Sequence, residues 1–282
     1  MKTWINGKLI DEREALIPMF DRAYLYGEGV FETLKSYSGK PAFVDRHYRR
    51  LTGNCKKLNI PLPLSEKEFE KALIDSLQAN KLGDAAVRIT VSTVGASFGL
   101  KRPDDASSNI TIFCSPLTMD PKLFEAGVKV LPLTSFTNDS KDTAHIKSTS
   151  YIIKMMARAE AAKANVFESI LKNDKGYWVE GSRTNFFLVL DKVVITSPLS
   201  DGLLPGITRE VVLEILKEQK ISHREDHVTD LMLKNAEEIF LTGSTAEVMP
   251  VCEIVGMCTK KVSSNSIAAR LGKAYLQLVN AA

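Results

Sequence analysis

Lys147 stands directly before a predicted helix, in the run His145-Ile-Lys-Ser-Thr-Ser-Tyr. The amino end of a helix carries partial positive charge, which disfavours an ammonium group. A lysine near such an end that is also partly buried can lose its proton near neutral pH and attack an aldehyde. The alternative is an ordinary surface lysine, because most lysines are exposed. Lys147 is therefore a candidate nucleophile for carbonyl chemistry.

Two glycine-containing turns are candidates for binding an anion. The first, Leu203-Leu-Pro-Gly-Ile-Thr-Arg, opens a predicted helix, so the backbone N–H groups of Ile207 and Thr208 and one hydroxyl can bind a phosphate. The second, Leu241-Thr-Gly-Ser-Thr-Ala-Glu-Val, places two hydroxyls beside a glycine at the end of a strand. The alternatives are that Thr208 is only a helix N-cap and that the second run is an ordinary turn.

Glu180 ends an apolar strand in Tyr177-Trp-Val-Glu-Gly-Ser. A carboxylate there could be the partner of a protonated ring nitrogen. The alternative is a strand-end glutamate in water, which is the commoner situation for this residue type.

Hydrophobic periodicity and turn residues predict an α+β chain of two domains, covering residues 1–116 and 123–282 and joined by a linker at 117–122. In the first domain we expect a hairpin around Asn6-Gly7, strands at 29–37, 86–93 and 109–115, and helices at 44–58 and 65–80. In the second we expect strands at 128–133, 168–171, 177–180, 185–190 and 192–195, and helices at 150–164 and 208–219. Segments at 231–235, 239–242 and 264–279 complete it.

The composition excludes several classes of protein. The formal net charge of the 282 residues is only +3, without a basic block, so we expect no nucleic-acid partner. The four cysteines lack the spacing of a disulfide framework or a metal site. Neither a secretory signal nor an apolar run of about 20 residues is present, so we expect a cytoplasmic protein without a membrane partner.

The order of these motifs resembles the fold-type IV group of pyridoxal-phosphate enzymes, which includes branched-chain aminotransferases, D-amino acid aminotransferases and aminodeoxychorismate lyases. Two N-terminal runs add to the likeness, Asp21-Arg-Ala-Tyr-Leu-Tyr-Gly-Glu-Gly-Val-Phe-Glu and His47-Tyr-Arg-Arg-Leu. The likeness covers nearly the whole chain. It implies a two-domain, D-amino acid aminotransferase-like α/β fold with a C-terminal cofactor-binding domain, and a homodimer.

The resemblance also implies roles for individual residues. Lys147 would carry pyridoxal 5'-phosphate and move a proton at the substrate Cα, and Glu180 would keep the pyridine nitrogen protonated. Leu204 would lie against the ring. Tyr151 is four residues after Lys147, whereas branched-chain enzymes present a tyrosine to the ring hydroxyl at an offset of five. The phosphate would be bound by Arg50, with Arg49 as a less favoured neighbour, and by Ile207, Thr208, Ser244 and Thr245.

The substrate is indicated less directly. The expected substrate contacts are Phe31, Arg88, Lys101 and Arg102. The run Phe98-Gly-Leu-Lys-Arg-Pro resembles a loop of branched-chain enzymes, and Glu32 replaces the threonine of the lyases. We therefore expect a transaminase that moves an amino group between a branched-chain-like amino acid and a 2-oxo acid such as 2-oxoglutarate. The alternatives are a D-amino acid or (R)-amine transaminase, a 4-amino-4-deoxychorismate lyase, and a non-catalytic binding protein.

Overall fold

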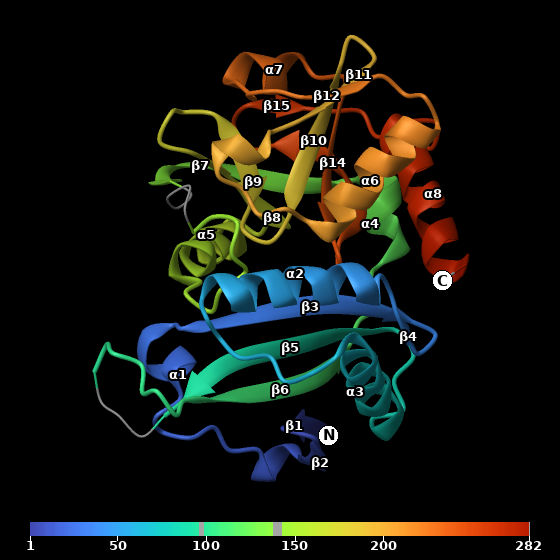
Figure 1. Ribbon diagram of the computed structural model, residues 1–282. Coiled ribbons are helices and arrows are strands. Elements are labelled where there is room, and N and C mark those ends of the chain that lie inside the picture. Colours follow the sequence, from blue (N-terminus) through green and yellow to red (C-terminus); the bar gives the residue numbers. More distant parts are fainter. Residues whose placement is uncertain (96–98, 138–142, 282) are drawn as a thin grey trace. The chain divides into compact units, whose positions relative to one another are not determined.

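The computed structural model describes residues 1–95, 99–137 and 143–281, and the chain forms two compact units (Figure 1). The first unit contains Met1–Thr118 together with the short segment Ile146–Tyr151. The second contains Met119–His145 and the chain from Ile152 onward. Lys147 therefore belongs to the first unit although it follows part of the second in sequence.

The first unit is built on a six-stranded sheet in the order β2-β1-β6-β5-β3-β4. Its strands are β1 (Lys2–Ile5), β2 (Lys8–Asp11), β3 (Gly29–Tyr37), β4 (Lys40–Pro41), β5 (Ala85–Val94) and β6 (Ser107–Pro116). Its helices are α1 (Arg22–Tyr26), α2 (Val44–Lys57) and α3 (Glu66–Ala79), with a short 3-10 turn at Glu12–Glu14. Asn6 and Gly7 both have positive φ, as the tight turn of the predicted β1–β2 hairpin requires.

Helices α2 and α3 pack on this sheet around one apolar core. Ser65 and Glu68 form the capping box that begins α3, as the sequence predicts. Phe69, Leu73 and Leu77 then recur at helical spacing and are fully buried. The local signals and the buried face of this helix therefore agree.

The segment Ile146–Tyr151 lies along β3. The N–H of Phe31 donates to the carbonyl of Lys147 at 2.9 Å, and the N–H of Thr149 donates to the carbonyl of Gly29 at 2.8 Å. A side chain at Gly29 would approach Ala23 and Thr149 too closely. The glycine therefore allows the segment to lie close to the start of β3, and this fixes the backbone of Lys147.

The second unit contains a nine-stranded sheet in the order β12-β11-β10-β13-β14-β7-β8-β9, with β15 paired to β14 (Figure 1). Its strands are β7 (Val128–Thr137), β8 (Glu168–Lys172), β9 (Trp178–Gly181), β10 (Asn185–Leu190), β11 (Val193–Thr196), β12 (His223–Glu225), β13 (Glu238–Gly243), β14 (Glu247–Ile254) and β15 (Cys258–Thr259). Its helices are α4 (Pro121–Ala126), α5 (Ile152–Lys163), α6 (Ile207–Glu218), α7 (Asp230–Asn235) and α8 (Ile267–Ala281), with a 3-10 turn at Leu199–Asp201.

Some elements differ from the sequence expectations. Helix α5 begins at Ile152 rather than Ser150, because the Thr149 N–H and the Ser150 hydroxyl donate to the carbonyls of Gly29 and Gly27 in the first unit. Helix α4 was not predicted, although Asp120 caps it and Pro121 occupies its first turn. Strand β14 was also missed, because Pro250 interrupts its pattern. Among the described residues, no helix is long and apolar enough to cross a membrane.

Candidate active site

Two predicted site residues, Lys147 and Arg88, lie around the ring of a third, Phe31, in the first unit. The Lys147 Nζ lies 4.6 Å from the ring centroid, and the guanidinium carbon of Arg88 lies 3.7 Å from it. The ring of Tyr151 approaches the same ring edge-on, with centroids 5.4 Å apart. Phe31 lies on β3 and Arg88 on the neighbouring β5, so the pairing of these strands places the two side chains together. The structure thus groups an amine and a guanidinium on one aromatic surface.

Arg88 is a partly buried cation without an acidic partner in the described part of the chain. Its side chain makes a long hydrogen bond, from Nε to Thr90 Oγ1 at 3.4 Å. Burial lowers the pKa of Arg88 from its usual value, and the neighbouring Tyr151 opposes this shift. A guanidinium in such a place can bind a carboxylate bidentately, so Arg88 is suited to an anionic group of a ligand.

Arg50 is held by a carboxylate that the sequence reasoning did not assign to the site. Its Nε and Nη2 donate to the two oxygens of Glu32, both at 2.7 Å. The Nδ1 of His47 lies 2.7 Å from Glu32 Oε2. His47 and Arg50 are about one helical turn apart on α2, so both face Glu32 on β3. Glu32 and His47 stand inside the two quoted N-terminal runs, and only the fold shows that they pair.

The electrostatics of this cluster follow from its burial. Burial alone would raise the pKa of Glu32, but Arg50 and then His47 outweigh it and hold that pKa well below its usual range. Burial lowers the pKa of His47, Glu32 opposes this, and the charges of Arg50 and Lys147 lower it further. Glu32 is thus paired with Arg50 and His47, and Lys147 lies close enough for its charge to act on His47. The helix end expected directly beside Lys147 is absent, since α5 begins five residues later.

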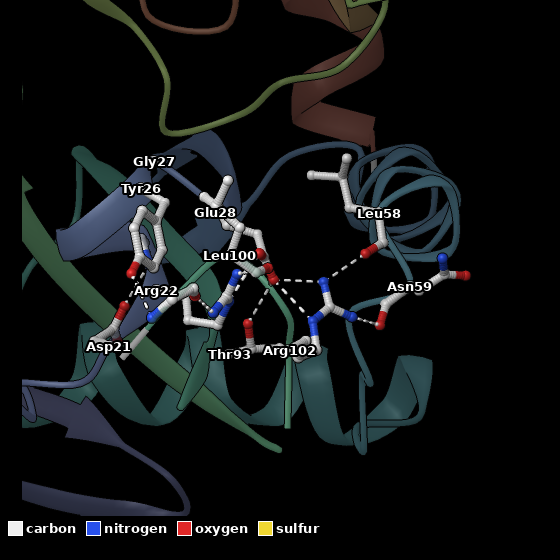
Figure 2. Close-up of polar contacts among 12 residues, drawn as sticks. Asp21, Arg22, Tyr26, Gly27, Glu28, Leu58, Asn59, Thr93, Leu100 and Arg102 are labelled. Atoms are coloured by element: carbon white, nitrogen blue, oxygen red, sulfur yellow. Dashed lines mark hydrogen bonds and ion pairs between the residues drawn. The ribbon is translucent and has the colours of Figure 1, made fainter. Parts of the chain in front are cut away.

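Arg102 is anchored within the first unit, as Figure 2 shows. Its guanidinium donates to Glu28 Oε1, with Nε at 2.9 Å, and to the carbonyls of Leu58 (2.8 Å) and Asn59. Arg22 pairs with the other oxygen of Glu28 at 2.8 Å and also holds the carbonyls of Gly99 and Leu100. These contacts fix the second half of the loop from Gly95 to Pro103.

The predicted substrate roles of Lys101 and Arg102 stay predictions. Lys101 is exposed. Phe98 and its two preceding residues, part of the predicted substrate loop, lie outside the described residues.

In the second unit, Glu180 is the penultimate residue of β9, and its carboxylate is held by contacts with Leu204 and Lys154. The N–H of Leu204 donates to Oε2 at 3.1 Å, and Lys154 Nζ donates to Oε1 at 2.6 Å. The Asn185 side chain holds the Leu204 carbonyl at 3.0 Å. Two predicted cofactor contacts, Glu180 and Leu204, are thus joined by a hydrogen bond. Lys154 was missed, and its spacing on α5 gives no signal that it faces an acid.

The amino end of α6 is open for an anion. Gly206 is its N-cap and has no side chain to cap the helix, and a side chain there would collide with Asn185 Oδ1. Ile207 and Thr208 form the first turn, whose N–H groups have no partner within a helix. The reading of Thr208 as the N-cap is therefore wrong. Its hydroxyl is buried and has no hydrogen-bond partner in the described structure.

Ser244 and Thr245 lie in the turn between β13 and β14 and are partly buried. Thr242, one residue before the end of β13, belongs to the second glycine-containing motif but is not among the expected phosphate contacts. Its hydroxyl is also buried and lacks a partner in the portion of the chain described. A buried hydroxyl without a partner costs about 1–3 kcal/mol, so such groups indicate a ligand. Hydroxyls and helix N–H groups are the donors that a phosphate accepts, and the residues present fit pyridoxal phosphate.

Comparisons with known proteins identify the family of this chain. A family model described as amino-transferase class IV matches residues 29–254. A Methanocaldococcus jannaschii protein, provisionally named a branched-chain-amino-acid aminotransferase, is 35% identical over 98% of this chain and 95% of its own length. The D-alanine aminotransferase of Bacillus licheniformis is 30% identical over 91% of this chain and 89% of its own.

A solved structure is also similar over nearly its whole length. It is a T.th. branched-chain amino acid aminotransferase complexed with N-(5'-phosphopyridoxyl)-L-glutamate, with a TM-score of 0.90 and 25% sequence identity. The match covers 99% of this chain and 94% of that one. The fold type predicted from the sequence is thereby confirmed. By sequence, fold and the length of the match, the chain belongs to the class IV aminotransferase family.

Proposed function

We propose that this chain is a pyridoxal-phosphate-dependent transaminase that moves the amino group of a branched-chain amino acid to a 2-oxo acid such as 2-oxoglutarate. The observation that carries the proposal is the group around Phe31. Lys147 provides an amine, and Arg88, which has no acidic partner in the described residues, provides a cation for a substrate carboxylate. An amino acid and a 2-oxo acid each bring such a carboxylate.

The cofactor assignment rests on the donors of the second unit and on the relative that was solved with a phosphopyridoxyl adduct. When bound, pyridoxal phosphate stabilises negative charge at the substrate Cα. Ile207, Thr208, Ser244, Thr245 and Arg50 would bind its phosphate. Glu180 would hold the proton of its ring nitrogen, and Lys147 would act as the general acid–base group at the substrate Cα.

A dicarboxylate acceptor fits Arg88. The guanidinium is desolvated enough for burial to lower its pKa, and a desolvated cation gains more from an added carboxylate than one in water does. Removing such a charge-assisted contact costs about 1.5–3 kcal/mol, or roughly one to two decades in binding. The acceptor 2-oxoglutarate is therefore expected to depend on Arg88 more than an acceptor with a single carboxylate does.

The choice of donor rests on similarity. The branched-chain assignment follows the archaeal relative and the solved structure, and the Bacillus licheniformis relative makes a D-amino acid the second candidate. The lyase alternative is weakened because Glu32, which replaces a threonine, is the buried partner of Arg50.

A screen of amino donors and acceptors tests the proposal. L-Leucine, L-valine and L-isoleucine should convert 2-oxoglutarate to glutamate, and their D-enantiomers should not. An Arg88→Met variant, compared with Arg88→Lys, should raise the KM for 2-oxoglutarate about tenfold or more and that for a monocarboxylate acceptor less. Activity only with D-amino acids would support the second candidate. Release of pyruvate and 4-aminobenzoate from 4-amino-4-deoxychorismate without an acceptor would refute the proposal.

We also propose that the protein is a homodimer. Exposed apolar residues gather in the stretch before and within α1, where Leu16, Met19 and Tyr24 are each about 70% exposed or more. On α5, Ile152, Met155 and Met156 are exposed as well. Large apolar side chains that are exposed to water at neighbouring positions commonly mark a protein interface. Sedimentation should give a dimer, and an active monomer would contradict the proposal.

A further inference from the structure

Lys154 and Glu180 form an ion pair inside the second unit, on the carboxylate that the proposed cofactor would use. The distance from Nζ to Oε1 is 2.6 Å, and the two side chains are 16% and 5% exposed. Lys154 lies in the first turn of α5, whereas Glu180 lies in β9, one residue before the strand ends. The pair therefore joins two elements at a point that is nearly closed to water.

In the protein without cofactor, the ion pair stabilises the buried carboxylate of Glu180. A carboxylate buried as deeply as that of Glu180 is strongly destabilised unless a positive group compensates it. The Leu204 N–H contributes a hydrogen bond to this carboxylate but no net charge. Lys154 brings a full positive charge to this buried acid.

The ammonium group of Lys154 also has other hydrogen-bond partners close by. Its Nζ donates to the Gly181 carbonyl at 3.3 Å, and its remaining exposure connects it to water. An ammonium has three N–H donors, so it can turn from the carboxylate toward these partners. A protonated ring nitrogen that pairs with Glu180 places a second positive charge nearby, and like charges repel.

We propose that Lys154 is the counter-ion of Glu180 in the cofactor-free protein and yields this place to the ring nitrogen of the cofactor. The inference rests on the proposed function. Lys154 then stabilises the cofactor-free form and weakens cofactor binding, because the new cation competes with one already present. A lysine that only tied α5 to β9 would stabilise both forms equally.

The test replaces Lys154 with Met, which keeps an apolar stem of similar length and removes the charge. Lys154→Arg is the matched control that keeps the charge. Thermal unfolding is followed with and without pyridoxal phosphate, and the Kd for pyridoxal phosphate is measured by fluorescence titration. In Lys154→Met, the Tm without cofactor should fall, the rise in Tm on adding cofactor should grow, and the Kd should fall about tenfold. The arginine variant should resemble the wild type.

A second variant and a double variant keep the inference falsifiable. Lys154→Gln keeps a hydrogen-bond donor without the charge, so it should shift the Kd in the same direction if the methionine variant does not fold. With Glu180→Gln present, Lys154→Met should no longer tighten binding. An unchanged or weaker affinity in the neutral variants, or equal losses of Tm with and without cofactor, would overturn the inference alone. A wild type that binds no pyridoxal phosphate would overturn the proposed function as well.

Discussion

Replacing Arg50 by alanine should lower the free energy of unfolding, in addition to any effect on cofactor binding. Glu32 is fully buried, and its two oxygens receive Nε and Nη2 of Arg50 at 2.7 Å. Without the guanidinium, the carboxylate is left with His47, whose pKa is itself lowered by burial. Breaking a buried ion pair in this way costs about 3–5 kcal/mol, against a typical total stability of about 5–15 kcal/mol.

The loss of cofactor affinity is a separate effect. If Arg50 binds the phosphate, its removal costs about 1.5–3 kcal/mol of binding, or roughly one to two decades in Kd. Because Arg50→Ala also leaves the buried Glu32 carboxylate unpaired with a cation and lowers the stability of the fold, excess pyridoxal phosphate alone should restore little of its activity. The double variant Glu32→Gln with Arg50→Ala removes the stranded charge. It should regain much of the stability and remain one to two decades weaker for the cofactor, and excess pyridoxal phosphate should rescue it.

Urea unfolding and cofactor titration of the wild type, the two single variants and the double variant separate these effects. Glu32→Gln alone is the control for the loss of the carboxylate. If Arg50→Ala is as stable as the wild type, the buried pair does not hold Arg50 as the distances indicate. If the double variant binds pyridoxal phosphate as tightly as the wild type, Arg50 does not bind the phosphate and the reasoning fails.

Four further outcomes are expected. Lys147→Ala should abolish turnover and the visible absorbance of the bound cofactor; borohydride reduction and peptide mapping check this, and a label on another lysine would contradict it. Glu180→Gln should stay loaded but transaminate slowly, and a half-reaction followed by absorbance should show no rescue by added cofactor. Thr208→Val should not destabilise the cofactor-free protein, because the lost hydroxyl has no partner in the described structure, yet it should weaken cofactor binding about tenfold in a titration. The pKa of His47 is lowered in the folded state, so the stability that His47 contributes is complete above about pH 6.5 and is lost as the pH falls toward the folded-state pKa. Urea unfolding between pH 7 and 5 should therefore show a smaller loss of the free energy of unfolding in His47→Gln than in the wild type. An equal dependence of that free energy on pH in both proteins would exclude this role.

Much of this molecule follows from local sequence. Asn6-Gly7 sets the first hairpin, Ser65 and Glu68 begin α3, and the Gly206 turn begins α6. These signals act through nearest neighbours, so they can be read without the fold. The order of the motifs, with Lys147 before Glu180, was also sufficient to predict the family and the fold type.

Only the tertiary structure decided how the buried charges pair. Lys154 and Glu180 meet across 26 residues of sequence, and Arg50 and Glu32 across 18. The strand-like segment that carries Lys147 is fixed by β3 rather than by a helix end. Periodicity reports which face of an element is buried, but not which distant polar group satisfies a buried charge. That choice depends on sheet register and helix packing, and these bring together side chains that no local pattern relates.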